Sequence, residues 1–230
     1  YADSLELATR DVVYLHPNVF IIHDDLQAHP VRAQRNFEWM LHSECPVSEV
    51  EGGLQVKGQR ARLVVEPVFP DPWEYKAVEG RYVPHADRKP LHCISLRPYW
   101  HHKWNVDPTR SPYPHWDSRC DSEELYDGSC RYLVVLSAVG AEEAAPYAAE
   151  GFAHGPARGV TLRSGEETAV VLYNPGRDAI RCGDLETDAE RLVLRDRGGR
   201  LSWAMVRGTC LTWQGRAIVQ ERREVSRAGG

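Results

Sequence analysis

Several features that would assign a protein class directly are absent from this sequence. No apolar run approaches the ~20 residues that a membrane helix requires. The first residues, YADSLELATRD, show no charged-then-apolar signal-peptide pattern. With 28 Lys and Arg against 33 Asp and Glu, the net charge is −5, without the basic excess of a general nucleic-acid binder. We therefore expect neither a membrane span nor a nucleic-acid partner.

The common catalytic and nucleotide-binding motifs are missing as well, because no GxSxG, GxGxxG, HExxH or Walker sequence is present. The six cysteines form no CxxC pair, which argues against a zinc ribbon. Cys120 and Cys130 flank a polar loop and could form a local disulfide in an oxidising compartment. The alternative is that all the cysteines are unpaired thiols.

Helical periodicity is almost absent. Residues 141–150 are the one Ala- and Glu-rich stretch, and Pro146 limits it to a helical turn or two. Elsewhere, short strand-like runs recur between Gly, Pro, Asn and Asp residues, at 61–66, 92–96, 132–137, 159–162, 168–172, 179–182, 191–195, 201–206, 210–213 and 217–220. This pattern predicts an all-β fold, a large antiparallel β-sandwich (supersandwich-like) with few short helical turns.

The length of 230 residues fits one β-sandwich domain that spans residues 1–230. The chain lacks an initial methionine and opens directly into strand-like sequence. We therefore expect it to be the C-terminal part of a longer, multi-domain protein.

The stretch from Val12 to His42 combines strand signals with metal-binding residue types. Residues 12–15 and 19–22 read as strands joined by a Pro-Asn turn, and Asp24 and Asp25 follow the second strand. His42 ends the next strand-like run, so an antiparallel hairpin would bring Asp24 and His42 to the same end of a sheet. A carboxylate beside an imidazole is a metal-ligand pair or an oriented general base. The alternative is a turn-capping aspartate and a histidine with a purely structural role.

Between residues 98 and 130 the strand pattern fails, and a long loop insertion rich in aromatic residues and cysteine is predicted. Its most distinctive part holds two tryptophans and two histidines: Trp100, His101, His102 and Trp104. Aromatic faces stack on sugar rings or bases, while His and Lys bind carboxylate, sulfate or phosphate, so this part is a candidate substrate-binding segment. Alternatively, these side chains anchor the loop by being half-buried.

Two arginines, Arg60 and Arg62, enter the strand-like run at 61–66. Strand alternation would place both on one face, where they could bind an acidic glycan or a neighbouring domain. A solvated face without a ligand is the alternative.

Read in order, the N-terminal residues resemble a family. The segments RDVVYLHPNVFIIHDDLQA and FEWMLHS are similar to the opening of the C-terminal β-domain of heparinase II/III-type polysaccharide lyases. The matching positions are Arg10, Pro17, Asn18, Asp24, Ala28, Trp39 and His42. The segment VKGQRARLVVEPVFP resembles the next element of that family, whereas the insertion at 98–130 has no counterpart in it.

The resemblance implies a periplasmic or secreted lyase that cleaves uronic-acid-containing acidic polysaccharides by β-elimination. Its partner would be an N-terminal α/α-toroid of the same enzyme, and this chain would form one wall of the cleft. By the same resemblance, His42 is a candidate catalytic residue, and Asp24 and His42 are candidate zinc ligands. The third zinc ligand would be an upstream histidine that this chain does not contain, and activity of the chain without the toroid is left open.

A function from a different class also fits the composition. In that case the chain is a non-catalytic carbohydrate-binding or structural β-sandwich module. Trp100, Trp104 and Trp116 would then form its binding surface.

Overall fold

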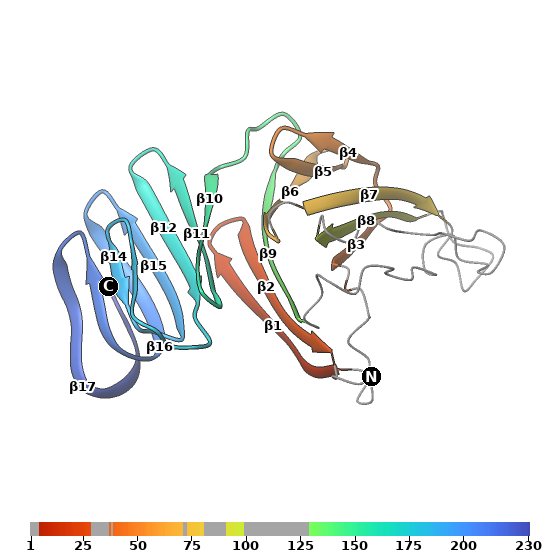
Figure 1. Cartoon of the computed structure of the whole chain (residues 1–230). Helices are drawn as coiled ribbons and strands as arrows, with labels where there is room; N and C mark the ends of the chain where they lie inside the picture. The colour runs from red at the N-terminus through yellow and green to blue at the C-terminus, as the bar shows by residue number, and fades with distance from the viewer. Residues whose placement is uncertain (1–4, 29–36, 38, 71–72, 81–90, 99–128) are drawn as a thin grey trace. The chain divides into compact units, whose positions relative to one another are not determined.

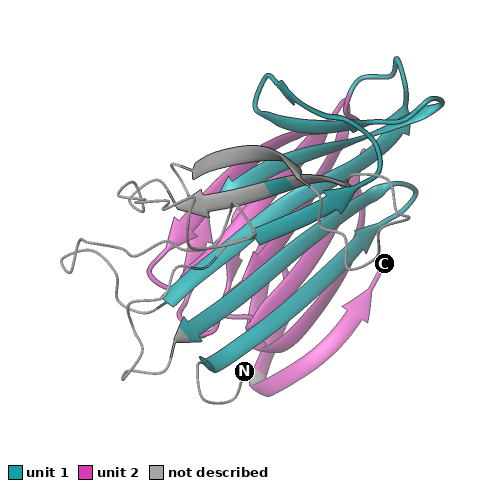
Figure 2. Cartoon of the chain, turned by 90° about the vertical axis from the view of Figure 1, so that its right-hand side faces the viewer, with its two compact units in different colours: residues 1–144 teal, residues 145–230 magenta. Residues whose placement is uncertain are grey.

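The computed structural model describes residues 5–28, 37, 39–70, 73–80, 91–98 and 129–230 (Figure 1). Every regular element in these ranges is a β-strand, and every strand pairing there is antiparallel. The all-β prediction is therefore confirmed. The chain divides into two compact units, Tyr1–Ala144 and Ala145–Gly230 (Figure 2), and each is described by itself.

The described residues of unit 1 form two antiparallel sheets. The larger is six-stranded, in the order β1-β2-β9-β6-β5-β4, and the smaller is three-stranded, in the order β3-β8-β7. The strands of the larger sheet are β1 (Leu5–Leu15), β2 (Val19–Ala28), β4 (Val47–Val50), β5 (Gly53–Lys57), β6 (Ala61–Phe69) and β9 (Ser129–Gly140). Those of the smaller sheet are β3 (Trp39–Ser43), β7 (Trp73–Gly80) and β8 (Leu91–Pro98).

A shared hydrophobic core joins the two sheets of unit 1. Trp39 and Ile94 come from the smaller sheet, and Leu54, Val65 and Tyr132 come from the larger one. Leu54, Val65, Ile94 and Tyr132 are completely buried. The Tyr132 hydroxyl also donates a hydrogen bond of 2.6 Å to the carbonyl oxygen of Phe37. Unit 1 is thus a sandwich in which apolar faces of two sheets pack together, as strand alternation requires.

Unit 2 is a single eight-stranded sheet in the order β10-β11-β12-β15-β16-β14-β13, with β17 paired to β16. The strands are β10 (Ala148–His154), β11 (Ala157–Ser164), β12 (Glu167–Tyr173), β13 (Ile180–Cys182), β14 (Leu185–Thr187), β15 (Arg191–Arg197), β16 (Arg200–Trp213) and β17 (Arg216–Gly229). Its core brings together residues from strands across this order, among them Ala157 of β11, Val170, Ile180 of β13, Leu194 and Trp213, and Phe152 of β10 packs against them. The sheet therefore curves around its own core.

Two glycine-containing turns in unit 2 lie between strand-like runs that the sequence predicts. Gly198 and Gly199 join β15 to β16 with φ values of 56° and 84°, and Gln214 and Gly215 join β16 to β17 with φ values of 51° and 74°. Two consecutive residues in the left-handed region form the hairpin turn whose twist matches that of the flanking strands. Glycine adopts this conformation without the steric cost that a side chain adds.

Two sequence expectations differ from the structure. Residues 141–150 form no helical turn, because a β-turn follows Gly140 and strand β10 begins at Ala148. The runs 201–206 and 210–213 belong to one strand, β16, which has a register irregularity between Met205 and Gly208. A Cβ atom at Gly208 would lie 2.8 Å from the Cα atom of Ala189, so glycine lets the bulged strand pack closely.

Candidate functional site

The predicted hairpin between the strand of Asp24 and the strand of His42 is wrong. Strand β2 pairs with β1 and β9, whereas β3 pairs with β8 in the other sheet. The strand β2 also continues to Ala28, so Asp24 and Asp25 lie within it and do not end it. The consecutive strands β2 and β3 thus belong to different sheets, and hydrophobic patterning does not reveal such a change.

Asp24 is held by an arginine on the neighbouring strand. Arg10 and Asp24 are direct cross-strand partners. The Nε and Nη2 atoms of Arg10 donate hydrogen bonds of 2.6 Å to the two carboxylate oxygens. Asp24 is only 5% exposed, and its hydrogen bond raises the pKa of Arg10. A zinc ion at Asp24 would have to displace this guanidinium, so the pair fits a structural role better than a metal site.

Asp25 points to the opposite face of β2, because successive side chains alternate along a strand. On that face lies a buried polar group that we call the His23 cluster: Asp11, His23, Asp25 and Arg131. Its cross-strand neighbours are Asp11 with His23 and Asp25 with Arg131, and the Arg131 Nε atom lies 3.2 Å from Asp25 Oδ1. Of these residues, only Asp25 was a candidate from the sequence.

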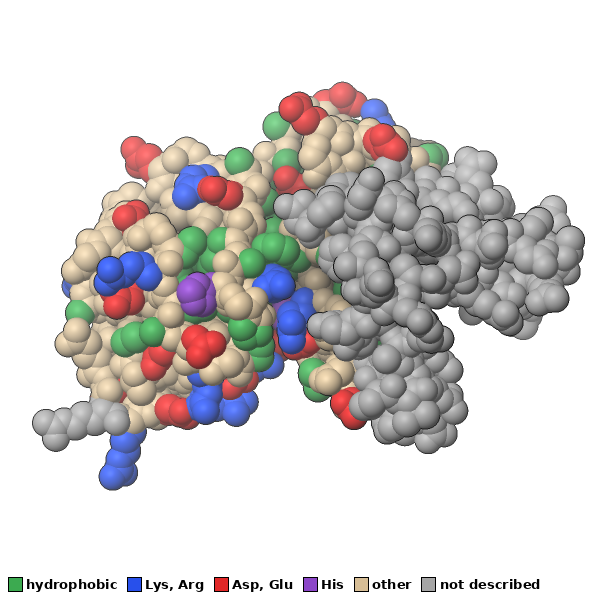
Figure 3. All heavy atoms as spheres, viewed as in Figure 1, with side chains coloured by type: hydrophobic (Ala, Val, Ile, Leu, Met, Phe, Trp, Pro, Cys, Tyr) green, Lys and Arg blue, Asp and Glu red, His purple; other side chains and the backbone are tan. Residues whose placement is uncertain are grey.

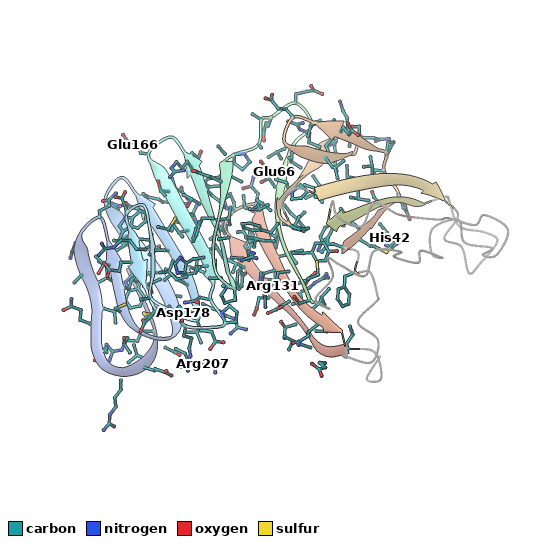
Figure 4. All side chains as sticks on the ribbon, in the orientation of Figure 1. His42, Glu66, Arg131, Glu166, Asp178 and Arg207 are labelled. Atoms are coloured by element: carbon teal, nitrogen blue, oxygen red, sulfur yellow. The ribbon has the colours of Figure 1, made fainter. Side chains whose placement is uncertain are left out.

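Burial dominates the electrostatics of the His23 cluster. His23 is 3% exposed, and this burial lowers its pKa to about 4, although Asp25, Asp11 and Asp24 act in the opposite direction. The imidazole is therefore neutral at pH 7 despite the acidic groups around it. Burial also raises the pKa of Glu66 on the adjacent part of the sheet, where Glu66 is the cross-strand partner of Val135 (Figure 4).

His42 lies on β3 opposite Cys93, and its side chain is exposed (Figure 4). Two other residues of the family resemblance, Asn18 and Trp39, hold the fold together. The Asn18 side chain donates a hydrogen bond of 2.8 Å to the carbonyl oxygen of Ala138, which ties the β1–β2 turn to β9. Trp39 is buried in the core between the two sheets. His42 is thus one of the exposed residues of this motif, as are Arg10 and Pro17.

Arg60 and Arg62 do not form a stripe along one strand. Arg60 precedes β6 and is exposed, whereas Arg62 lies within β6. The Nη1 atom of Arg62 donates to Gln55 Oε1 at 2.8 Å, and its Nη2 atom donates to the carbonyl oxygen of Glu143 at 2.6 Å. Arg62 thus connects β5 and the segment after β9, whereas Arg60 is the more exposed of the two arginines.

The remaining candidates lie outside the described residues. They are the insertion residues Trp100, His101, His102, Trp104 and Trp116, and also Cys120. Their binding role and the Cys120–Cys130 disulfide stay predictions. On the face shown in Figure 3, the described acidic and basic side chains are interspersed, with neither sign forming a continuous area.

Metal binding also stays a prediction. Within the ranges that the structure describes, no group of three or more His, Cys, Asp or Glu side chains is placed to hold a metal ion. The two proposed ligands lie on strands of different sheets, and Arg10 binds both oxygens of Asp24. The residues present therefore do not fit a zinc site, and we derive no chemical step through zinc.

The chain matches no protein-family model, and no curated protein matches it significantly. Among the residues whose structure is described, no helix is long and apolar enough to cross a membrane.

Proposed function

We propose that this chain is the β-sandwich module of a heparinase II/III-like polysaccharide lyase. The enzyme would cleave uronic-acid-containing acidic glycans by β-elimination, and the module would form one wall of the substrate cleft. The observation that carries the proposal is the ordered motif from Arg10 to His42. Its residues support the proposal because they occupy distinct positions in one sandwich: a cross-strand ion pair, a turn and a core tryptophan.

β-Elimination needs a base that takes the proton next to the uronate carboxylate and an acid that protonates the departing oxygen. It also needs groups that stabilise the charge that develops on the carboxylate. His42 is the candidate acid or base of this chain, since its imidazole is exposed on β3. Arg60 is a candidate for binding the carboxylate. The α/α-toroid would supply the rest of the catalytic groups.

The His23 cluster has a different part in this proposal. A neutral, buried imidazole beside two carboxylates and an arginine does not reach a polymeric substrate. We assign it to the stability of the sheet that carries the motif. We therefore expect protonation of His23 to change the free energy of unfolding and not the rate of the reaction.

The test uses the protein expressed with whatever its gene encodes before Tyr1. It is incubated with heparin, heparan sulfate, hyaluronan, chondroitin sulfate, alginate and polygalacturonate, and the ultraviolet absorbance of the unsaturated uronate product is followed. We expect product from at least one polymer. We expect His42→Gln to lower the rate by about 10²-fold or more, the usual loss for a general acid or base.

His154→Gln is the matched control, because His154 is also an exposed strand histidine but lies in unit 2. Its rate should equal that of the unchanged protein. Absence of unsaturated product from every polymer would overturn the lyase proposal. Equal rates for His42→Gln and His154→Gln would leave the lyase class standing but remove His42 from the reaction.

A further inference from the structure

Unit 2 contains a cavity of about 300 Å³, and all residues that line it belong to this unit. One wall comes from β10, β11 and β12, and the other comes from the β13–β14 and β16–β17 turns (strands labelled in Figure 1). Cross-strand pairing places Glu150 beside Thr161, and Arg163 beside Thr168, on the first wall. The two ends of the curved sheet, β10 and β13, thus border the same cavity.

The opposite wall is held in place by its own hydrogen bonds. The backbone N–H of Gln214 donates to the carbonyl oxygen of Asp184 at 2.9 Å, which ties the two turns together. The indole Nε1 atom of Trp213 donates to Asp196 Oδ2 at 3.0 Å, so the ring has a fixed orientation. Trp213 is 7% exposed and belongs to the core of unit 2, so it gives the cavity a small aromatic surface whose position is fixed before a ligand binds.

Several polar side chains of the cavity have no hydrogen-bond partner within the described ranges. They are the half-buried Thr161 and Thr168 on one wall, and the exposed Asp184 and Gln214 on the other. Arg163 is bound to Glu150 at the rim by an ion pair of 2.6 Å, and both side chains are more than half exposed. The cavity thus combines aromatic surface from Phe152 and Trp213 with hydroxyl, amide and carboxylate groups on facing walls.

We infer that this cavity binds an uncharged sugar ring. A pyranose has apolar C–H faces that pack on aromatic rings, and its hydroxyls both donate to carboxylates and accept from amides and hydroxyls. At about 30 Å³ per water-sized group, the cavity holds roughly ten such groups, which is the size of one hexose. This site is independent of the lyase proposal, because none of its residues lies in unit 1.

Charge selects against acidic ligands at this site. The lining carries two carboxylates, Glu150 and Asp184, and one guanidinium, Arg163. Because Arg163 already neutralises Glu150, Asp184 leaves a negative cavity. A uronate or a phosphate would be repelled, whereas glucose, galactose, mannose or N-acetylglucosamine would not.

The test is a titration of the ¹⁵N-labelled chain, followed by amide and indole NMR shifts. The four neutral sugars are compared with glucuronate, which differs from glucose by its carboxylate in place of a hydroxymethyl group. We expect shifts at Thr161, Asp184 and the Trp213 indole with at least one neutral sugar. The dissociation constant should be on the order of 1 mM, as for other ligands of this size. Glucuronate should bind several-fold more weakly than glucose.

Asp184→Asn should weaken binding of the neutral sugar about tenfold, the effect of losing one charged hydrogen-bond acceptor. The same variant should reduce the preference for glucose over glucuronate, because the cavity loses its net charge. Asp178→Asn is the matched control, since Asp178 is an exposed aspartate of unit 2 outside the cavity (Figure 4). Unchanged signals elsewhere in the spectrum show that each variant is folded.

Three results would overturn the inference. One is the absence of shifts at the cavity residues with every neutral sugar. Another is tighter binding of glucuronate than of glucose. The third is an equal affinity of the two aspartate variants for the same sugar.

Discussion

The Arg10–Asp24 pair allows a quantitative test of whether the family motif holds the fold. Asp24 is 5% exposed and accepts both of its hydrogen bonds from Arg10, whose own side chain is 57% exposed. Removing one partner of a fully buried pair costs about 3–5 kcal/mol. Because water screens one side of this pair, we expect Arg10→Met to lower the free energy of unfolding by about 2–3 kcal/mol.

Removing the charge of Asp24 should lower the free energy of unfolding by less than removing that of Arg10. In Asp24→Asn the half-exposed Arg10 can turn its charge into water, and the amide oxygen still accepts one hydrogen bond, so we expect a loss of about 1–2 kcal/mol. The order of the two losses follows from which partner is buried. In the double variant Arg10→Met/Asp24→Leu, no buried carboxylate is left without a partner. The free energy of unfolding should therefore fall by less than the sum of the two single losses.

The assay is urea unfolding followed by circular dichroism, with amide hydrogen exchange in β1 and β2 to locate the change. Arg227→Met is the matched control, because Arg227 pairs with Glu221 on an exposed strand of unit 2, and it should cost at most about 0.5 kcal/mol. If Arg10→Met costs no more than this control, or less than Asp24→Asn, the structural assignment of the pair is refuted.

Three further predictions concern other parts of the chain. The pKa of His23 is about 4 in the folded protein and 6.5 ordinarily, so the protein takes up a proton at His23 when it unfolds below pH 6.5. The free energy of unfolding should therefore fall by at most about 3 kcal/mol between pH 6.5 and 4. Urea titrations should show no such fall in His23→Gln. If the chain is instead a non-catalytic binding module, glycan binding measured by calorimetry should be lost in Trp104→Ala and kept in His42→Ala; the opposite result excludes that alternative. Gly159→Ala should cost about 1–3 kcal/mol in thermal unfolding, because its Cβ would lie 2.1 Å from the Phe152 ring, and a smaller loss in the Phe152→Ala background would confirm the cause.

The local structure was largely predictable from the sequence. The apolar run before the Pro-Asn turn and the one after it form β1 and β2, as expected. The Gly198–Gly199 turn was also predictable, because its backbone needs a conformation that glycine adopts at little cost. Strand identity and turn position depend on nearby residues, and these are the features that a single sequence reveals.

Strand partners were not predictable in the same way. The hairpin expected for Asp24 and His42 assumed that consecutive strands pair, but β2 pairs with β9, which begins at Ser129. The same long-range pairing brings Arg131 beside Asp25 and completes the His23 cluster. The local signal was a run of polar residues, His23 to Asp25, inside a longer strand. It indicates that neighbouring charges must exist but not which residues supply them.

Asp24 and Asp25 face opposite sides of the sheet, and this limits which conclusions the family resemblance supports. Adjacent residues of a strand face opposite sides, so the two carboxylates have different partners, Arg10 and Arg131, and cannot act as one catalytic or metal-binding pair. A motif whose carboxylate is already bound by the arginine of the same motif is a property of the sandwich itself. It would persist in relatives that have lost activity, because losing it destabilises the sheet. The lyase proposal therefore depends on the complete ordered motif up to His42 and on the product assay, whereas the Arg10–Asp24 pair by itself supports only the fold.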